Sequence, residues 1–175
     1  MAREYVEESA GGHKVFVETE DSHAATHLQD TPGLINLLKE AVPKIALAGT
    51  RGKQERFQID MGRVIGTQDL VETQEGDEVI YAKRPNRDRY SPFVKNREPQ
   101  PTSSLVIRLD KAGENEYDIY TAYIGILTPS MPYGDGRDSP EGLDFWKRHA
   151  LILGHQTILP ETVTKNCPWE GPSSS

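Results

Sequence analysis

The strongest constraint on the fold is a pair of strand-like segments in the second half of the chain. Leu105, Ile107 and Leu109 alternate with other residues, and residues 117–126 form the longest run of strand-forming side chains. Between them lie the loop-forming residues 112–115. Consecutive strands joined by a short turn pair antiparallel, so the sequence predicts a long β-hairpin.

Shorter segments of the same kind precede and follow this hairpin. Gly66 and Thr67 mark a bend inside one of them. Because turn signals separate the segments, we expect them to join the hairpin in a mainly antiparallel arrangement. Residues 81–84 and 117–124 are expected to lie in one antiparallel sheet. The predicted shorter strands are residues 13–18, 57–61, 64–71, 78–83 and 150–153.

The clearest helix signal begins at Thr31-Pro32, where a capping side chain precedes a proline suited to the first helical position. An apolar stripe follows at helical spacing, and Pro43 ends it. Residues 21–27 fit either a helical turn or a loop. Ser139-Pro140 repeats the start signal for a short helix. The sequence therefore predicts an α+β fold, with an N-terminal helix, a mainly antiparallel sheet and a short C-terminal helix. The stripe consists of Leu34, Leu37, Leu38 and Ala41.

The length of 175 residues predicts a single domain over residues 1–175, with flexible ends at residues 1–12 and 165–175. The single cysteine, Cys167, excludes an intramolecular disulfide and a zinc site built on cysteines. The acidic N-terminus lacks the apolar run of a signal peptide, and no window reaches the roughly 20 apolar residues of a membrane span. We expect a cytoplasmic protein that does not contact a membrane, or a domain of a longer chain.

Charge is unevenly distributed along the chain. The net charge is −7, which by itself argues against nucleic acid as a partner. The basic segment, residues 83–97, contains six basic residues and one acidic residue, Asp88. It therefore carries a charge of +5, and the rest of the chain carries −12. A local basic patch can still hold a polyanion, because its field acts over about 8–10 Å. A solvated basic loop explains the same pattern equally well.

Cofactor and metal motifs are weak. The sequence contains neither a Walker-type phosphate loop nor a Rossmann glycine pattern, and it lacks a Gly-x-Ser-x-Gly nucleophile elbow. We therefore expect no cofactor. His23 and His27 are four residues apart, which on a helix places both on one face, where they can hold a metal. The residues between them include no glutamate, and exposed histidines near a helix start are common, so we expect no metal.

The chain does carry groups suited to RNA cleavage without a metal. That reaction needs a base for the 2′-hydroxyl, an acid for the leaving oxygen and cations for the phosphorane charge. Residues 81–90 end a predicted strand with several cations, and Arg108 lies on the first hairpin strand. Depending on the register, Arg108 shares a face with Thr121 or with Tyr120. Thr121 and Tyr123 are also ordinary strand residues.

The second hairpin strand reads Tyr-x-Ile-Tyr-Thr-Ala-Tyr and follows a basic residue on the neighbouring strand. This arrangement resembles the barnase–EndoU–colicin–RelE superfamily of small ribonucleases, over about residues 23–125. The resemblance implies a metal-independent ribonuclease of the toxin or phage type, with RNA as its partner. It implies His23 or His27 as the base, and Thr121 and Tyr123 as substrate-positioning groups. The implied phosphate-stabilising cation is Lys83, Arg84 or Arg87. Further basic residues that we expect to bind substrate are Arg89, Lys95, Arg97 and Arg108.

Two other functions stay open. The acidic body suits a non-enzymatic partner protein, such as an immunity or antitoxin-like inhibitor that meets a basic toxin. In a nucleic-acid-binding module, the basic segment holds phosphates while Tyr81 and Tyr90 stack on bases. His149 directly precedes an apolar run and can enter a site, but we favour a core or surface histidine there.

Overall fold

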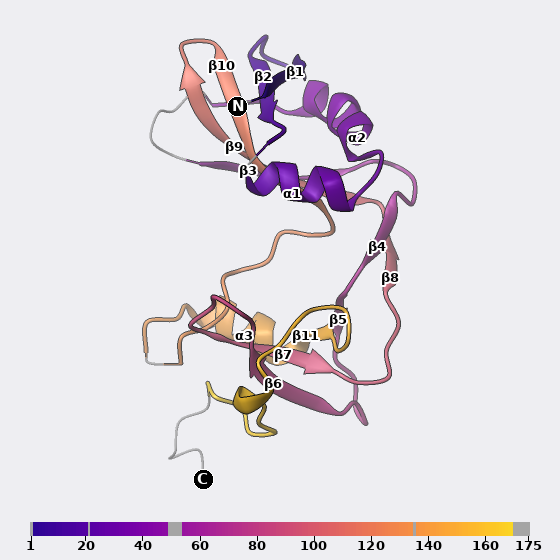
Figure 1. Cartoon of the computed structure of the whole chain (residues 1–175), viewed down its shortest axis with the longest axis vertical. Helices are drawn as coiled ribbons and strands as arrows, with labels where there is room; N and C mark the ends of the chain where they lie inside the picture. The colour runs from indigo at the N-terminus through magenta and orange to yellow at the C-terminus, as the bar shows by residue number, and fades with distance from the viewer. Residues whose placement is uncertain (1, 21, 49–53, 135, 170–175) are drawn as a thin grey trace. The chain divides into compact units, whose positions relative to one another are not determined.

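The computed structural model describes residues 2–20, 22–48, 54–134 and 136–169, without the side chain of His23. The chain divides into two compact units. Unit 1 comprises Met1–Gly66 and Thr102–Leu127, and unit 2 comprises Thr67–Pro101 and Thr128–Ser175. The elements of each unit are labelled in Figure 1. The sequence predicts one domain over residues 1–175, and its strand-like segments carry no sign of this division.

Unit 1 is built on a five-stranded sheet in the order β1-β2-β10-β9-β3. Neighbouring strands pair antiparallel, except that β2 and β10 run parallel. The α+β class and the mainly antiparallel pairing predicted from the sequence are thus confirmed. The strands are β1 (Arg3–Glu8), β2 (Lys14–Glu18), β3 (Glu55–Asp60), β9 (Ser104–Gly113) and β10 (Glu116–Ile124).

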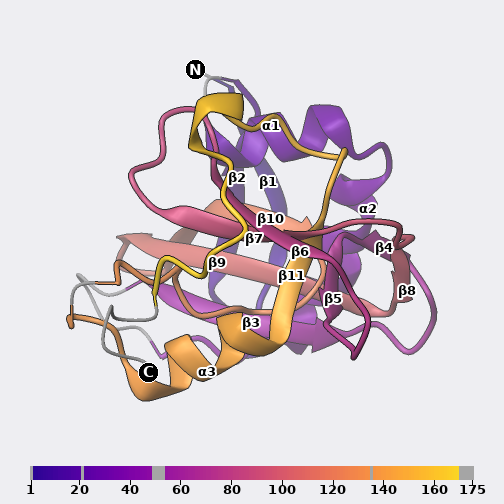
Figure 2. The same cartoon turned by 90° about the horizontal axis from the view of Figure 1, so that it is seen from below.

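The predicted long hairpin is strands β9 and β10, which lie side by side in Figures 1 and 2. Ile119 lies opposite Leu109, and Thr121 lies opposite Arg108, so Tyr120 is an extra residue that shifts the register. Because of this bulge, every side chain of β10 after Tyr120 lies on the face opposite to the one that strict alternation predicts. Alternation alone leaves open whether Arg108 shares a face with Thr121 or with Tyr120. The observed register pairs Arg108 with Thr121.

Two short helices of unit 1, α1 (His23–Asp30) and α2 (Leu34–Ala41), replace the single helix predicted from Thr31. Thr31 ends α1 instead of starting α2, and its N–H donates to the carbonyl of His27 at 2.9 Å. Gly33, with φ +86°, begins α2, since a left-handed turn between the helices favours glycine. The predicted stripe is otherwise correct: its members pack into the core, and the 3₁₀ turn η1 (Val42–Lys44) follows at Pro43.

The prediction of an N-terminal helix is wrong, because two strands precede α1. Strand β2 was expected, whereas β1 lies in a segment that the sequence predicts to be loose. β1 is an edge strand whose one fully buried apolar side chain is Val6, so it lacks the alternation that marks a strand. Arg3 also ties it to β10, with ion pairs of 3.0 Å to Glu116 and 2.8 Å to Asp118.

Unit 2 holds a four-stranded sheet in the order β5-β11-β7-β6. β11 pairs parallel with β7, whereas the β6–β7 and β5–β11 pairs are antiparallel. Strands β4 (Gly66–Gln68) and β8 (Gln100–Thr102) form a separate two-stranded sheet. The four strands of the larger sheet are β5 (Leu70–Glu72), β6 (Val79–Lys83), β7 (Tyr90–Val94) and β11 (His149–Ile152).

The predicted short C-terminal helix is α3 (Pro140–Arg148), which leads directly into β11 (Figure 1). Its start is as expected, because the Ser139 hydroxyl accepts from the Gly142 N–H at 3.0 Å. The 3₁₀ turn η2 (Pro160–Thr162) follows β11. Within the described ranges, no helix combines the length and the apolar character needed to span a membrane.

The prediction that residues 81–84 and 117–124 share one sheet is wrong. Both segments contain strands, but β6 belongs to the sheet of unit 2 and β10 to the sheet of unit 1. β6 pairs with β7, the next strand along the chain, whereas β10 lies between β9 and the distant β2. A strand pattern identifies the segment but not its partner, which depends on long-range contacts.

Candidate anion-binding site

A polar pocket of about 310 Å³ lies in unit 2, at the turn that joins β6 to β7. We call it the arginine pocket, because three of the predicted cations line it. The turn supplies most of the lining, and two residues before α3 complete it. The described residues that line it are Arg84, Asn86, Arg87, Asp88, Arg89, Ser91, Ser130 and Met131.

The turn is tight because of Asn86. Its φ of +62° lies in the left-handed region, which asparagine tolerates better than most residues. The Arg87 N–H donates to the carbonyl of Arg84 at 3.1 Å and closes the turn. At its base, Lys83 lies opposite Tyr90, with the Lys83 ammonium 5.2 Å from the centre of the ring. The turn thus brings the guanidinium groups of Arg84 and Arg87 to one pocket.

Arg84 is partly buried, whereas Arg87 is exposed. One terminal nitrogen of its guanidinium donates to Gln156 Oε1 at 2.8 Å. Its Nε is buried, and no hydrogen-bond partner for it exists among the described residues. Burial, together with the nearby charge of Arg87, lowers the pKa of Arg84 from its usual value. An arginine stays protonated nonetheless, so the site keeps a charge that a bound anion would stabilise.

Arg89 is held in place by three contacts. It donates to the carbonyl of Met131 at 3.0 Å and lies 3.6 Å from the Asp88 carboxylate. Its guanidinium carbon also lies 4.2 Å from the centre of the Tyr133 ring, a cation–π contact. An arginine fixed in this way loses little side-chain entropy when it binds an anion.

The charge of the arginine pocket is clearly positive. Three arginines face one carboxylate, Asp88, so the formal charge of the lining is +2. The side chain of Asp88 is 81% exposed, and water therefore screens its contribution strongly. The like charges and the partial burial of Arg84 make this pocket the candidate site for an anion with several oxygen acceptors.

The other cations of the basic segment lie outside this lining. Lys95 pairs with Glu78 at 2.8 Å, and Arg97 pairs with Asp77 at 2.8 Å. Lys83 packs over Tyr90 instead of lining the pocket. The positive charges of the basic segment therefore do not form one patch. Carboxylates neutralise Lys95 and Arg97, and three arginines lie together at the turn.

The remaining predicted site residues belong to unit 1. The His27 ring lies 6.0 Å from the Tyr123 ring, centre to centre. Thr121, 8% exposed, lies opposite Arg108, whose buried Nε has no hydrogen-bond partner among the described residues. The side chain of His23 lies outside the described residues. The predicted residues that come together therefore form two groups, one in each unit.

The other histidines have structural contacts. His149 Nδ1 lies 2.8 Å from the carbonyl of Phe145, and its ring stacks on that of Phe145 at 4.0 Å. His155 Nδ1 lies 2.9 Å from Asp69 Oδ1. In the described part of the chain, no three residues among His, Cys, Asp and Glu gather into a possible metal site.

Sequence reasoning missed several residues of the arginine pocket. Ser130 and Met131 approach it from a segment without strand or helix signals, and Gln156 reaches Arg84 from 72 positions further along the chain. Ser91 lies within strand β7, so no local pattern marks it as a pocket residue. The Pro85-Asn86 dipeptide is the one local signal for the turn, because both residues favour turns.

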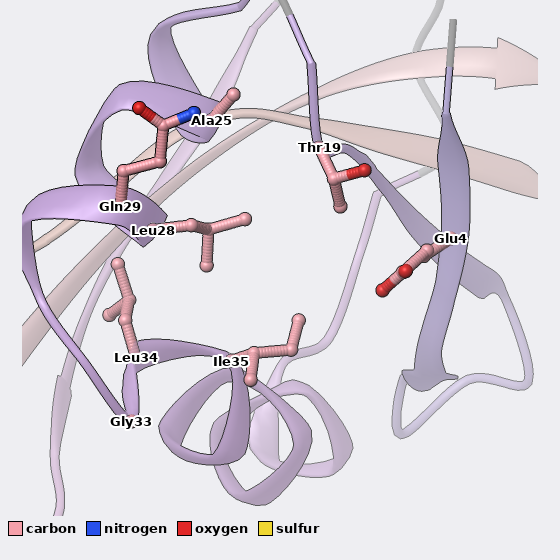
Figure 3. A pocket seen from close by; sticks show the side chains of 8 residues that line it. All are labelled: Glu4, Thr19, Ala25, Leu28, Gln29, Gly33, Leu34 and Ile35. Carbon is pink, nitrogen blue, oxygen red and sulfur yellow. The ribbon is translucent and has the colours of Figure 1, made fainter.

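A second cavity, of about 240 Å³, lies in unit 1 and has a different character. Leu28, Leu34 and Ile35 point into it from the two helices, and Glu4 and Thr19 face them from the side of β1 and the end of β2 (Figure 3). An apolar wall with a carboxylate at its edge disfavours a phosphate. The arginine pocket is therefore the stronger candidate for an anion.

No protein-family model, curated protein or solved structure matches the chain.

Proposed function

We propose that the protein binds RNA, with a phosphate held in the arginine pocket of unit 2. The observation that carries this proposal is the convergence of Arg84, Arg87 and Arg89 on one pocket with a single exposed carboxylate. Arginine is suited to phosphate because its planar donors match two oxygens at once. The like charges of Arg84 and Arg87, which with burial lower the pKa of Arg84, favour an anion beside them.

Aromatic contacts for the bases lie near this pocket. The Tyr133 side chain is 43% exposed and sits beside Arg89. Tyr81, expected to stack on bases, packs edge-on against Trp169 at 5.5 Å, and Tyr90 lies under Lys83. Of these three aromatic residues, Tyr133 is the one that combines wide exposure with a pocket arginine. The guanidinium groups of Arg89 and Arg137 already lie over this ring, at 4.2 and 3.9 Å, so a base would have to displace one of them to stack there.

The binding test is a comparison of two double variants in EDTA. Arg84→Ala with Arg87→Ala removes two cations that line the pocket. Lys95→Ala with Arg148→Ala removes two exposed cations of unit 2 that are paired with carboxylates outside it. Each charged hydrogen bond contributes about 1.5–3 kcal/mol, so the pocket variant should bind single-stranded RNA at least about 100-fold more weakly. The control should bind like the wild type.

Equal affinity of the two double variants would contradict the proposed site. The control should unfold at nearly the wild-type temperature, since an exposed ionic group contributes about 0–1 kcal/mol. The pocket variant also loses the hydrogen bond from the partly buried Arg84 to Gln156, so circular dichroism must show that it is folded before the affinities are compared. No binding of any RNA by folded wild type would instead favour the partner-protein function, in which an acidic body meets a basic protein.

The second candidate function is RNA cleavage without a metal, of the kind that the superfamily resemblance implies. The observation that favours it is the 6.0 Å approach of the His27 and Tyr123 rings in unit 1. His27 has the chemistry of a base, Thr121 and Tyr123 offer hydroxyls, and Arg108 offers a cation. His23, at the start of the same helix, is an alternative base.

This candidate is tested by incubating total RNA with the protein in EDTA. His27→Ala should slow cleavage by about 10²–10⁴-fold if His27 is the base. His155→Gln is the matched control, because His155 contacts Asp69 in unit 2, outside both groups of predicted residues. Wild-type protein that binds RNA but leaves it intact would remove the cleavage function and keep the binding function.

A further inference from the structure

Resting on the proposed RNA binding, we propose that the arginine pocket takes a terminal phosphate monoester in preference to the phosphodiester inside a strand. The monoester can be the end of an RNA or part of a mononucleotide. Three features of the pocket lead to this selectivity: its charge, the absence of further cations from its described lining, and its supply of hydrogen-bond donors.

The charge matches a dianion. Three arginines and one aspartate give the lining a formal charge of +2. A phosphate monoester carries about −1.5 to −2 at pH 7, whereas each internal phosphodiester carries −1. A monoester therefore balances the like charges of Arg84 and Arg87 more fully than a diester does.

The pocket is also an isolated site and not part of a track. Proteins that bind the interior of a strand line a groove with cations, so that successive phosphates are held. Beyond the turn, the next cations of the basic segment are Lys95 and Arg97, and each is 2.8 Å from a carboxylate. On the other side, Lys83 packs over the Tyr90 ring, and Arg137 lies 3.9 Å from the centre of the Tyr133 ring. None of these four residues lines the pocket. In the described part of this segment, the arginines that line the pocket are therefore gathered around a single phosphate position.

Hydrogen-bond donors provide the third argument. A monoester presents three acceptor oxygens, and a diester presents two that are not bridging. The pocket offers the forked donors of Arg84 and Arg87, and the hydroxyl of Ser130 beside them. A third phosphate oxygen can therefore accept a charged hydrogen bond that a diester does not form.

The experiment compares four ligands of the full chain by competition in EDTA. Three are one RNA sequence with a 5′-phosphate, with a 3′-phosphate, or with hydroxyls at both ends; the fourth is adenosine monophosphate. We expect a phosphorylated end to bind about tenfold or more tightly than hydroxyl ends, which corresponds to one additional charged hydrogen bond. The difference should vanish in the Arg84→Ala, Arg87→Ala variant and persist in the Lys95→Ala, Arg148→Ala control.

The outcomes separate this inference from the proposed function. If all three RNAs bind equally and all weaken in the pocket variant, the terminal selectivity is contradicted while RNA binding at the pocket stands. If adenosine monophosphate binds at the pocket but none of the RNAs does, RNA binding is contradicted while the monoester site stands. If no ligand responds to loss of the two arginines, both are contradicted.

Discussion

The two units differ in how they use their side chains. In unit 1, helices α1 and α2 and the five-stranded sheet share one large apolar cluster, which includes Leu38, Ile107 and Tyr117. In unit 2, the described apolar clusters are small, such as that of Ile80, Ala82 and Phe93. Unit 2 instead gathers three arginines at one turn, where their repulsion and burial disfavour the folded state. Unit 1 is thus organised mainly for packing, and unit 2 carries a feature that a ligand would stabilise.

The largest expected effect tests the difference in packing. Leu38→Ala removes a fully buried side chain of the large cluster, and Ile80→Ala removes one of 5% exposure from a small cluster. Large-to-alanine changes cost about 2–5 kcal/mol of unfolding free energy, depending on how well the site collapses. We expect Leu38→Ala near the upper end and Ile80→Ala near the lower end.

Urea unfolding followed by circular dichroism and by tryptophan fluorescence measures both changes. Trp146 and Trp169 belong to unit 2, so fluorescence follows that unit. A smaller loss for Leu38→Ala than for Ile80→Ala would contradict the difference in packing between the units.

The helix caps give a smaller effect that should be alike in the two units. The Ser22 hydroxyl accepts from the Ala25 N–H in α1, and the Ser139 hydroxyl accepts from the Gly142 N–H in α3, both at 3.0 Å. Replacing either serine with alanine should cost about 1 kcal/mol, because a helix-end donor loses its acceptor. Thermal unfolding of each variant measures the loss, and Thr26→Ala is an exposed control in α1. A cost at Ser139 near zero would show that α3 does not depend on its cap.

The smallest effect is the acid sensitivity of an exposed ion pair in unit 1. Arg63 donates to both oxygens of Glu40, at 2.6 and 2.8 Å, and these hydrogen bonds lower the pKa of Glu40. A carboxyl whose pKa is lower in the folded state adds stability above its unfolded pKa, about 4.3. That stability is lost as the pH falls through the folded pKa.

Glu40→Gln should therefore reduce stability slightly at neutral pH and leave it unchanged at strongly acid pH. The comparison is the unfolding midpoint of variant and wild type between pH 7 and pH 2. A difference that is constant over this range would show that the Glu40 charge is not its cause.

Sequence reasoning succeeded where local periodicity determines structure. Alternation predicts the hairpin β9–β10, and helical spacing predicts the buried stripe of α2. Ser139-Pro140 predicts the start of α3. It failed where long-range contacts decide. The parallel pairing of β2 with β10, the bulge at Tyr120 and the edge strand β1 leave no clear local pattern.

The candidate site shows the same limit. The charge of the basic segment is visible in the sequence, and so is the Pro85-Asn86 turn inside it. The sequence does not show which cations are left without a carboxylate partner. Asp77 neutralises Arg97 and Glu78 neutralises Lys95, and these pairs form only in the folded chain. The approach of His27 to Tyr123 likewise required the contact between α1 and β10.

The most direct test of the central claim is the salt dependence of RNA binding. For single strands, the logarithm of the binding constant falls with the logarithm of salt concentration by about 0.7 per phosphate contact. Losing Arg84 and Arg87 should reduce this slope by about 0.7, because the two arginines hold one phosphate, whereas the Lys95→Ala, Arg148→Ala control should keep the wild-type slope. Equal reductions in the two variants would contradict the claim that the arginine pocket, and not the general charge of unit 2, holds the phosphate.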